Sequence, residues 1–453
     1  MPTARSGVRP DQISVSYRTI GELKLDPRNA RLHSAAQVRQ LAASIEAFGF
    51  NVPILVDGQD NVLAGHGRLL ACKRLGYVQV PTIRLDHLSE AQARAFQLAD
   101  NRLAEIAVWD ERLLAEQLKA LSELDLDFSL ELTGFSMGEI DFRIESLSAS
   151  TEENAPDPDD LPPVAAAFAV TRPGDLWRLE CHRLLCADAQ DAASYERLLQ
   201  GALASVVFSD PPYNVPIQGH VSGKGAIVHR EFAMASGELS EQEFVEFLRR
   251  VLSLLARHSV SGSIHFICMD WRHAEALLAA ARGVYSELKN LCVWVKDRAG
   301  MGSLYRSQHE LVFVFKSGVA AHCNNVQLGR HGRDRTNVWR YPGIHTLREG
   351  EEGDVLALHP TCKPVKMVAD ALLDCSKRND LVFDAFLGSG TTLIAAERVG
   401  RVCYGIEIDP LYVDVAIRRW QAHSGGDARL AASAETFAQR EALASAALKE
   451  MPA

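Results

Sequence analysis

A carboxylate, two prolines and an aromatic ring follow one another in the segment ASVVFSDPPYN, residues 204–214. Residues 205–208 predict a short buried strand, and Asp210, Pro211, Pro212 and Tyr213 follow it closely. Each proline fixes φ at about −65° and lacks a backbone N–H, so this turn is rigid and cannot continue a β-ladder. The turn is either a cap on the strand or a support that holds a hydrogen-bond acceptor and a ring in place for a reaction.

A second pattern, LVFDAFLGSGTTLIAAERVGRVCYGIEIDP, occupies residues 381–410. It predicts a strand, a glycine turn, a helix that ends at Gly400, and a second strand with Glu407 near its end. This is the nucleotide-binding half of a Rossmann-like fold, in which an acid about twenty residues after the glycines binds ribose hydroxyls. Leu393 stands where a dinucleotide site needs a small residue. We therefore expect a ligand with a ribose but no phosphates, such as S-adenosylmethionine; a βαβ unit without a ligand is the alternative.

The elements that must position these motifs fall into four parts of the chain. Residues 15–110 alternate short strands and helices, and the segment NVPILVDGQDNVLAG predicts a hairpin. Residues 111–163 are an acidic helical segment followed by a linker rich in proline and acids. Residues 164–422 alternate strands and helices, which predicts an α/β domain with a mostly parallel sheet. Residues 423–453 are a helical or frayed tail.

Together, SDPPYN and DAFLGSGT resemble the motifs of the DNA amino-methyltransferases, which modify exocyclic amines of bases. The segments HPTCKP (359–364) and GDLWRLECHRLLCADA (174–189) resemble two further parts of that family. The order of catalytic motif, basic region and cofactor motif is similar to the class called beta. Ala385 departs from the family, which usually has proline there. The resemblance implies a Rossmann-like methyltransferase domain with S-adenosylmethionine as cofactor.

The resemblance also implies which residues bind that cofactor. Glu407 would hold the ribose hydroxyls, Asp188 would contact the adenine, and Lys363 would face the methionine carboxylate. The residues expected around the methionine moiety and the sulfonium are Asp384, Phe386, Gly388, Gly390 and Thr391.

In that family, the segment that corresponds to the turn at residues 210–213 holds the amine that is methylated. An exocyclic amine is a weak nucleophile because its lone pair is delocalised into the ring. The carboxylate of Asp210 and the carbonyl of Pro211 can accept its two N–H bonds and so direct the lone pair at the methyl group. The ring of Tyr213 offers a stacking surface for a base that has left the double helix.

The charge distribution is compatible with a polyanionic partner although the net charge is −10. Residues 121–160 hold twelve acids and one base, whereas residues 296–341 hold eight bases and three acids. A local basic stretch matters more for DNA binding than the total charge. We expect residues 300–345 to recognise the target, with Trp339 and Tyr341 contacting bases; a solvated loop is the alternative. The expected DNA contacts are Lys224, Arg330, Arg333, Arg335 and Arg340.

Residues 20–105 resemble the N-terminal nuclease-like domain of ParB proteins. The resemblance rests on the segments LKLDPRNAR, LAASIEAFGFNVPILVD, AGHGRLLACKRLG and ADNRLAE. In that family a Gly-x-x-Arg turn at a helix start binds nucleotide phosphate, and Gly65 and Arg68 match it. His66 and Gly67 depart from the commoner Glu-Arg, so a catalytically silent DNA-binding or docking module is the favoured alternative.

The remaining features limit the function. The cysteines are scattered and lack CxxC spacing, so we expect reduced thiols in a cytoplasm and no metal at Cys181, His182 and Cys186. No apolar run is long enough to span a membrane, and the first residues do not predict a secretory signal. We expect a cytoplasmic enzyme that methylates double-stranded DNA, with adenine N6 as the favoured target. An N4-cytosine enzyme, a methyltransferase acting on RNA or protein glutamine, and a non-enzymatic ParB-like DNA-binding protein are alternatives; a homodimer and a cognate restriction nuclease are left open.

Overall fold

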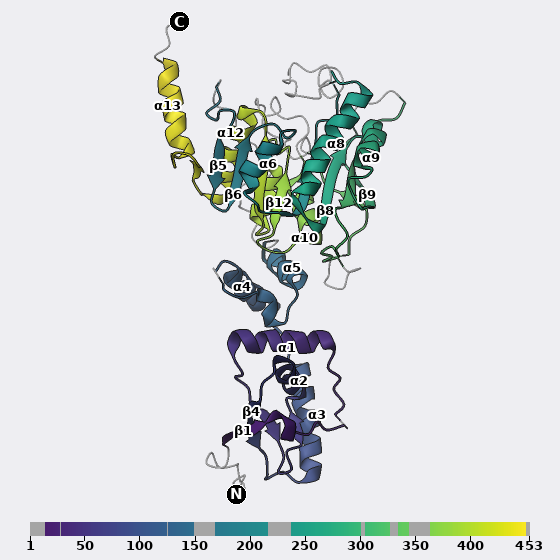
Figure 1. Cartoon of the computed structure of the whole chain (residues 1–453), viewed down its shortest axis with the longest axis vertical. Helices are drawn as coiled ribbons and strands as arrows, with labels where there is room; N and C mark the ends of the chain where they lie inside the picture. Colours follow the sequence, from purple (N-terminus) through teal and green to yellow (C-terminus); the bar gives the residue numbers. More distant parts are fainter. Residues whose placement is uncertain are drawn as a thin grey trace. The chain divides into compact units, whose positions relative to one another are not determined.

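The computed structural model describes residues 14–27, 29–124, 126–148, 168–215, 237–299, 304–326, 334–343 and 363–449. The chain divides into two compact units, Met1–Ser150 and Thr151–Ala453 (Figure 1). The linker that we predicted at 151–163 lies outside the described residues. In the ranges given above, no helix is both long and apolar enough to cross a membrane.

The first unit contains β1 (Val15–Thr19), the 3-10 helix η2 (Ile20–Glu22), α1 (Ala35–Phe48), β2 (Ile54–Val56), β3 (Val62–Ala64), α2 (His66–Leu75), β4 (Gln79–Arg84), α3 (Glu90–Ile106), α4 (Glu111–Ser122), η3 (Leu130–Thr133) and α5 (Met137–Ser148).

The second unit begins with β5 (Leu176–Leu179), β6 (His182–Cys186), α6 (Ala192–Leu199), β7 (Ala204–Ser209), α8 (Glu241–Arg257), β8 (Ser259–Met269), η5 (Trp271–His273), α9 (Ala274–Ala281), β9 (Glu287–Val295) and β10 (His309–Lys316). It continues with β11 (Val338–Arg340), α10 (Val365–Cys375), β12 (Leu381–Asp384), α11 (Thr391–Arg398), β13 (Val402–Glu407), α12 (Pro410–Ser424), β14 (Ala428–Leu430) and α13 (Phe437–Lys449).

The first unit has a four-stranded sheet in the order β1-β4-β2-β3. Strands β2 and β3 form the predicted hairpin, and the Asp57 carboxylate closes its turn by accepting the backbone N–H groups of Gln59 and Asn61. Helices α1 and α2 end at Gly49 and Gly76, as the sequence indicated. A separate apolar cluster joins α4, η3 and α5, so the acidic segment has a small core of its own.

The described residues of the second unit form one sheet of ten strands, in the order β11-β9-β10-β8-β7-β12-β13-β6-β5-β14. Its central strands β8, β7, β12, β13 and β6 are parallel, and antiparallel pairs flank them on both sides. The predicted α/β class is confirmed. Strand β14 pairs with β5, so the sheet continues past residue 422, where we expected the domain to end.

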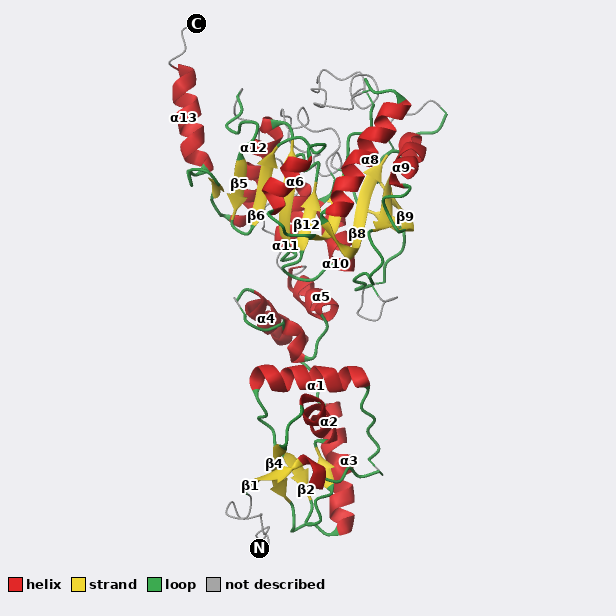
Figure 2. Cartoon of the chain, in the orientation of Figure 1, coloured by secondary structure: helices red, strands yellow, loops and turns green. Residues whose placement is uncertain are grey.

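Helices cover both faces of this sheet (Figure 2). Helices α10, α11 and α12 share an apolar core with one face, and α6, α8 and α9 share a second core with the other. Helix α8 shows why these helices form: Ser240 and Glu243 make a capping box, and Phe244, Leu248 and Val251 recur at helical spacing toward the sheet.

The chain reverses its direction of winding between β7 and β12. Strand β7 pairs in parallel with β8 on one side and with β12 on the other, while β12 is followed along the chain by β13. In open α/β sheets such a switch point leaves a crevice at the carboxyl ends of the strands. Ser209 and Asp384 end β7 and β12, so both sequence motifs meet at this crevice.

Candidate active site

The crevice is a pocket that brings the two separated motifs together. Its walls include Asp210 and Tyr213 after β7 and Glu407 at the end of β13. Most of the residues proposed from the sequence for catalysis or cofactor binding line it: Asp210, Pro211, Pro212, Tyr213, Lys363, Asp384, Phe386, Gly388, Thr391 and Glu407. Asp188 and Gly390 are not among its lining residues.

Asp210 lines the pocket with a side chain that is 21% exposed. Its Oδ1 accepts a hydrogen bond from the Tyr213 hydroxyl at 2.6 Å, and its Oδ2 accepts one from Lys363 Nζ at 2.5 Å. A carboxylate has about four acceptor positions, so both oxygens can still accept a bond from a substrate. The turn therefore fixes the orientation of Asp210 without exhausting its hydrogen-bonding capacity.

Lys363 makes contacts that the sequence did not indicate. Its ammonium contacts Asp210 at 2.5 Å and Glu310 at 3.1 Å, and the expected contact with the carboxylate of the cofactor's methionine stays a prediction. Burial alone would lower the pKa of Lys363, but the two carboxylates outweigh it and the pKa is raised. The ammonium is therefore held protonated inside the site.

Tyr213 is a hydrogen-bond donor in this site as well as a ring. Burial, together with the neighbouring Asp210 and Glu310 carboxylates, raises the pKa of its phenol well above the ordinary value. The hydroxyl therefore stays protonated and donates to Asp210. The predicted stacking role of the ring is compatible with this position, because Tyr213 also lines the pocket.

Asp384 is a buried support for the glycine turn. Its Oδ1 accepts bonds from the Ser209 hydroxyl at 2.9 Å and the Phe386 N–H at 3.0 Å, and its Oδ2 accepts one from the Thr392 hydroxyl at 2.7 Å. Burial raises the pKa of Asp384 to about 7, although these hydrogen bonds oppose that shift. The residue thus joins β7, β12 and α11 in the wall of the pocket.

Glu407 fits the predicted role of a hydroxyl acceptor. Its Oε2 accepts the Gly388 N–H at 2.8 Å, and its Oε1 accepts the Asp409 N–H at 2.8 Å. Both bonds hold the carboxylate at the end of β13, where it lines the pocket. The glycine turn and the acid are therefore one structural unit.

Gly390 supports the pocket from outside. It precedes α11 with φ of 88°, and a Cβ atom there would lie 2.9 Å from the Cβ of Ala416 on α12. Only glycine allows this backbone conformation and this close helix packing together. Asp188 follows β6 and accepts the Gln190 N–H, while its neighbours Ala187 and Ala189 line the pocket.

Asn214 is a residue that the sequence reasoning missed. It has φ of 55°, its Nδ2 donates to the Leu239 carbonyl at 2.8 Å, and its Oδ1 accepts the Gly237 N–H at 3.0 Å. The side chain therefore ties the end of the proline turn to the segment just before α8. The signal was present, because asparagine tolerates a left-handed conformation and bonds to nearby backbone.

The predicted target-recognition region divides into two kinds of residue. Trp339 and Tyr341, which we expected to contact bases, are only 5% and 9% exposed and belong to the core on the α10 side of the sheet. Arg340 is exposed on β11. Lys224, Arg330 and Arg333 lie outside the described residues.

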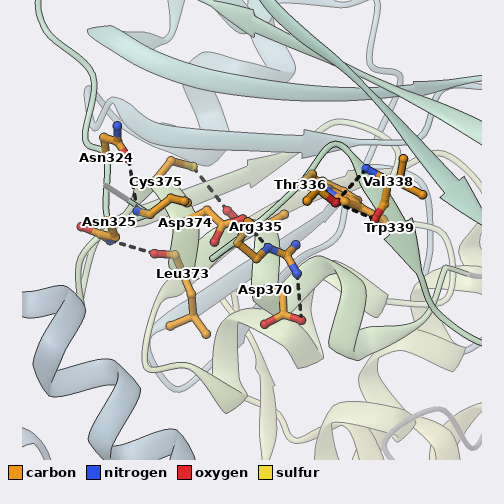
Figure 3. Close-up of polar contacts among 12 residues, drawn as sticks. Asn324, Asn325, Arg335, Thr336, Val338, Trp339, Asp370, Leu373, Asp374 and Cys375 are labelled. Atoms are coloured by element: carbon orange, nitrogen blue, oxygen red, sulfur yellow. Dashed lines mark hydrogen bonds and ion pairs between the residues drawn. The ribbon is translucent and has the colours of Figure 1, made fainter. Parts of the chain in front are cut away.

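Arg335 is anchored within the protein. Its Nε donates to Asp374 at 3.0 Å, its Nη1 lies 3.5 Å from Asp370, and it also donates to the Tyr341 hydroxyl (Figure 3). On the other side of the same helix end, Asn325 donates to the carbonyls of Leu373 and Ser376. These contacts fasten residues 325 and 335 to α10, so we no longer count Arg335 among the proposed phosphate contacts.

The predicted ParB-like pair lies in the first unit. Gly65 precedes α2 with φ of 101°, and a Cβ there would come within 3.1 Å of the Arg68 guanidinium. The pair is therefore adjacent, as the motif requires, and its phosphate-binding role stays a prediction.

In the second unit, both ring nitrogens of His182 are hydrogen-bonded within the protein, to Glu397 and to the Cys403 N–H. Within the described ranges, no group of three or more potential metal ligands occurs.

Family models match three parts of the chain. A model of N6/N4 DNA methylases matches residues 204–418, and a model of the ParB N-terminal domain matches residues 5–102. A model of the helix-turn-helix domain of ParB-methyltransferases matches residues 112–173. The sequence alone indicated only an acidic helical segment there, because its charge is more conspicuous than the spacing of α4 and α5.

Individual proteins are similar to the two ends of the chain. The ParB-like nuclease domain-containing protein YnaK of Escherichia coli K12 is 40% identical over 82 residues, which are 18% of this chain and 94% of that protein. The DNA adenine methyltransferase YhdJ of the same organism is 25% identical over 254 residues, 51% of this chain and 80% of that protein. Among solved structures, the M1.HpyAVI–SAM complex is 19% identical, with a TM-score of 0.37 over 52% of this chain and 98% of that one.

Proposed function

Because the chain is a DNA methyltransferase of the N6/N4 family with an N-terminal ParB domain, we propose that it transfers a methyl group to N6 of adenine in double-stranded DNA. S-adenosylmethionine is the cofactor. The observation that carries the proposal is the position of Asp210, at the end of β7 and in one pocket with Glu407. An aspartate at the first position of this motif favours adenine by family resemblance, and the similar YhdJ is named an adenine methyltransferase.

The residues of the pocket fit this cofactor. The Glu407 carboxylate can accept bonds from two ribose hydroxyls, and apolar residues such as Ala187, Ala189 and Ile408 can enclose an adenine ring. The carboxyl groups of Asp210 and Asp384 also line the pocket. The cofactor supplies an electrophilic methyl group; the protein supplies position and charge.

The chemistry then depends on how the target amine is held. The base must leave the duplex, because its amine is unreachable inside the helix, and Tyr213 lines the space that it would enter. Asp210 and the Pro211 carbonyl accept the two amine N–H bonds, so the nitrogen lone pair points at the methyl group. When bound, the cofactor would supply the methyl group and keep the electrons of its broken carbon–sulfur bond, while the amine nitrogen forms the new bond and releases one proton. Asp210 is 21% exposed and can pass that proton to water.

An N4-cytosine target would use the same contacts, because cytosine also has an exocyclic amine. Expression in a host without DNA methylation, followed by sequencing that detects modified bases, separates the two. We expect N6-methyladenine at one short sequence. N4-methylcytosine would overturn the adenine assignment, and unmodified DNA from soluble, cofactor-binding protein would overturn the enzymatic function.

We propose two further assignments for the whole chain. The cytoplasm is its site of action, because its substrate is DNA. The ParB domain is a docking or DNA-binding module rather than a nucleotide hydrolase, since His66 and Gly67 replace the commoner residues of the turn.

A further inference from the structure

Four charged side chains of alternating sign form a continuous chain that ends at Asp210 in the catalytic turn. Lys296 contacts Glu310 at 2.5 Å, Glu310 contacts Lys363 at 3.1 Å, and Lys363 contacts Asp210 at 2.5 Å. Lys296 follows β9, Glu310 lies on β10, and Lys363 precedes α10. Residues far apart in the sequence therefore converge on the carboxylate that is proposed to hold the substrate.

The chain of charges is balanced and largely buried. Glu310 is 12% exposed and Lys363 is 4% exposed, while Lys296 at the outer end is 30% exposed. Two positive and two negative charges sum to zero. Buried charges are tolerated when they are paired, and removing one partner leaves an uncompensated charge behind.

Glu310 occupies the centre of this arrangement. Its Oε2 lies 3.1 Å from Lys363 Nζ and accepts a longer contact of 3.4 Å from the Tyr213 hydroxyl. Lys363 and Tyr213 are also the two groups that donate to Asp210. One carboxylate thus contacts both of the groups that orient the catalytic one.

The negative charge of Glu310 also affects the reaction, because it sets the net charge of the cluster beside the amine nitrogen. The amine nitrogen becomes positively charged as it takes the methyl group, until it releases its proton. A cluster with a net charge of +1 next to that nitrogen would oppose the change, whereas a neutral cluster does not. Without Glu310, the cluster of Lys296, Lys363 and Asp210 carries that surplus.

We propose that Glu310 is a positioning residue for methyl transfer, which holds Lys363 and Tyr213 against Asp210 and cancels the surplus positive charge beside the amine. The inference rests on the proposed role of Asp210. Glu310 does not line the cofactor pocket, so its effect falls on the chemical step rather than on cofactor binding.

The test compares single-turnover rates of methyl transfer to DNA at saturating cofactor, with cofactor affinity measured in parallel. We expect Glu310→Gln to react about 10- to 100-fold more slowly than wild type, with nearly unchanged cofactor affinity. Glu287→Gln is the matched control, because Glu287 lies on β9 with a side chain that is 49% exposed and pairs with Lys289. It should react at the wild-type rate.

Charge restoration distinguishes this role from a merely structural one. The double variant Lys296→Gln/Glu310→Gln has a neutral cluster again, so it should react faster than Glu310→Gln alone. A double variant as slow as the single one would overturn the charge argument. If Glu310→Gln does not fold, Glu310→Asp is measured in its place. The aspartate keeps the negative charge, but its shorter side chain places that charge farther from Lys363. A wild-type rate in Glu310→Asp would overturn the positioning role.

Asp210→Ala, measured beside these variants, separates the role of Glu310 from the proposed function. A slow Asp210→Ala with a fast Glu310→Gln would overturn only the role of Glu310. A fast Asp210→Ala would overturn the proposed function of the catalytic turn itself.

Discussion

At the scale of single residues, Glu407 is the point at which the pocket is expected to hold its cofactor. Its carboxylate is positioned by two backbone N–H groups, and its removal leaves the ribose hydroxyls without a charged acceptor. We expect Glu407→Ala to weaken cofactor binding by about 1.5–3 kcal/mol, or roughly 10- to 150-fold. Calorimetry with S-adenosylmethionine measures this, with Glu246→Ala on the exposed side of α8 as the control. Equal affinity in both variants would mean that the cofactor binds elsewhere.

The buried carboxyl of Asp384 predicts a dependence of stability on pH. Burial raises its pKa in the folded protein to about 7 from the ordinary value of 3.8. Between these values the folded state holds a proton that the unfolded state has released, so stability falls as pH rises through this window. Relative to Asp384→Asn, the wild type should lose up to about 4 kcal/mol between pH 4 and pH 8.

Chemical denaturation of both proteins at pH 4, pH 6 and pH 8 tests this expectation. The difference in the free energy of unfolding between wild type and Asp384→Asn should shrink or change sign toward high pH. A difference that is constant over this range would show that Asp384 is ionised throughout.

The sequence predicted single residues well where a local motif contains them. Asp210 and Glu407 were found because each lies at the end of a strand within a recognisable segment. The partners of Lys363 could not be found in that way. Glu310 is 53 residues before it and lies on β10, whereas Lys363 precedes α10, so only the packing of the folded chain brings the two together. Trp339 was misjudged for a similar reason, because local sequence does not show which face of β11 is buried.

At the scale of elements, the packing of α11 on α12 depends on Gly390. A Cβ at this position would meet Ala416 at 2.9 Å, and the backbone has φ of 88°. Gly390→Ala should therefore lower the free energy of unfolding by about 2–4 kcal/mol through strain and overpacking together. Gly283→Ala is the control, since Gly283 has φ of 83° but no atom within 4 Å of the added Cβ. An equal decrease in both variants would mean that the close approach to α12 contributes nothing.

The anchor of Arg335 on α10 makes a further prediction at this scale. Arg335→Ala removes ion pairs with Asp370 and Asp374, whose side chains are each 13% exposed, and should destabilise the protein by about 2–4 kcal/mol. The salt dependence of DNA binding should not change.

By contrast, Arg330→Ala/Arg333→Ala should reduce the slope of log K against log salt by about 0.9 for each phosphate that the variant no longer neutralises. If folded Arg335→Ala shows a reduced slope of log K against log salt, Arg335 contacts a DNA phosphate after all.

Most helices and strands could be predicted from the sequence, but the strands that pair antiparallel at the edges of the sheet could not. The glycines and apolar runs of the β12–α11–β13 unit were enough to predict it. The short strand β14 is three residues long, so its pairing with β5 leaves no periodic signal. The helix-turn-helix match at residues 112–173 was not predicted either, since the sequence indicated only an acidic helical segment and a linker there.

At the scale of the whole molecule, the two compact units predict independent folding. A fragment of residues 164–453 should be soluble and should bind S-adenosylmethionine with the affinity of the full chain, because the sheet and the pocket belong to one unit. We expect it to methylate DNA with a weaker affinity for the DNA, as a docking role of the first unit requires. Aggregation of the fragment beside a soluble full chain would show that the units share a core.

The central claim is that Asp210 holds the target amine for methyl transfer. Asp210→Ala removes a charge-assisted hydrogen bond worth about 1.5–3 kcal/mol and the alignment that accompanies it, so the single-turnover rate should fall at least about 100-fold. We expect the protein to fold and to bind the cofactor, because Lys363 keeps its contact with Glu310; the surplus positive charge that the variant leaves in the cluster adds to the decrease in rate. Asp210→Asn should be less affected, since an amide oxygen still accepts. The decisive measurement is transfer of labelled methyl to DNA by Asp210→Ala: a decrease of about 100-fold is the predicted result, and a wild-type rate would contradict the account.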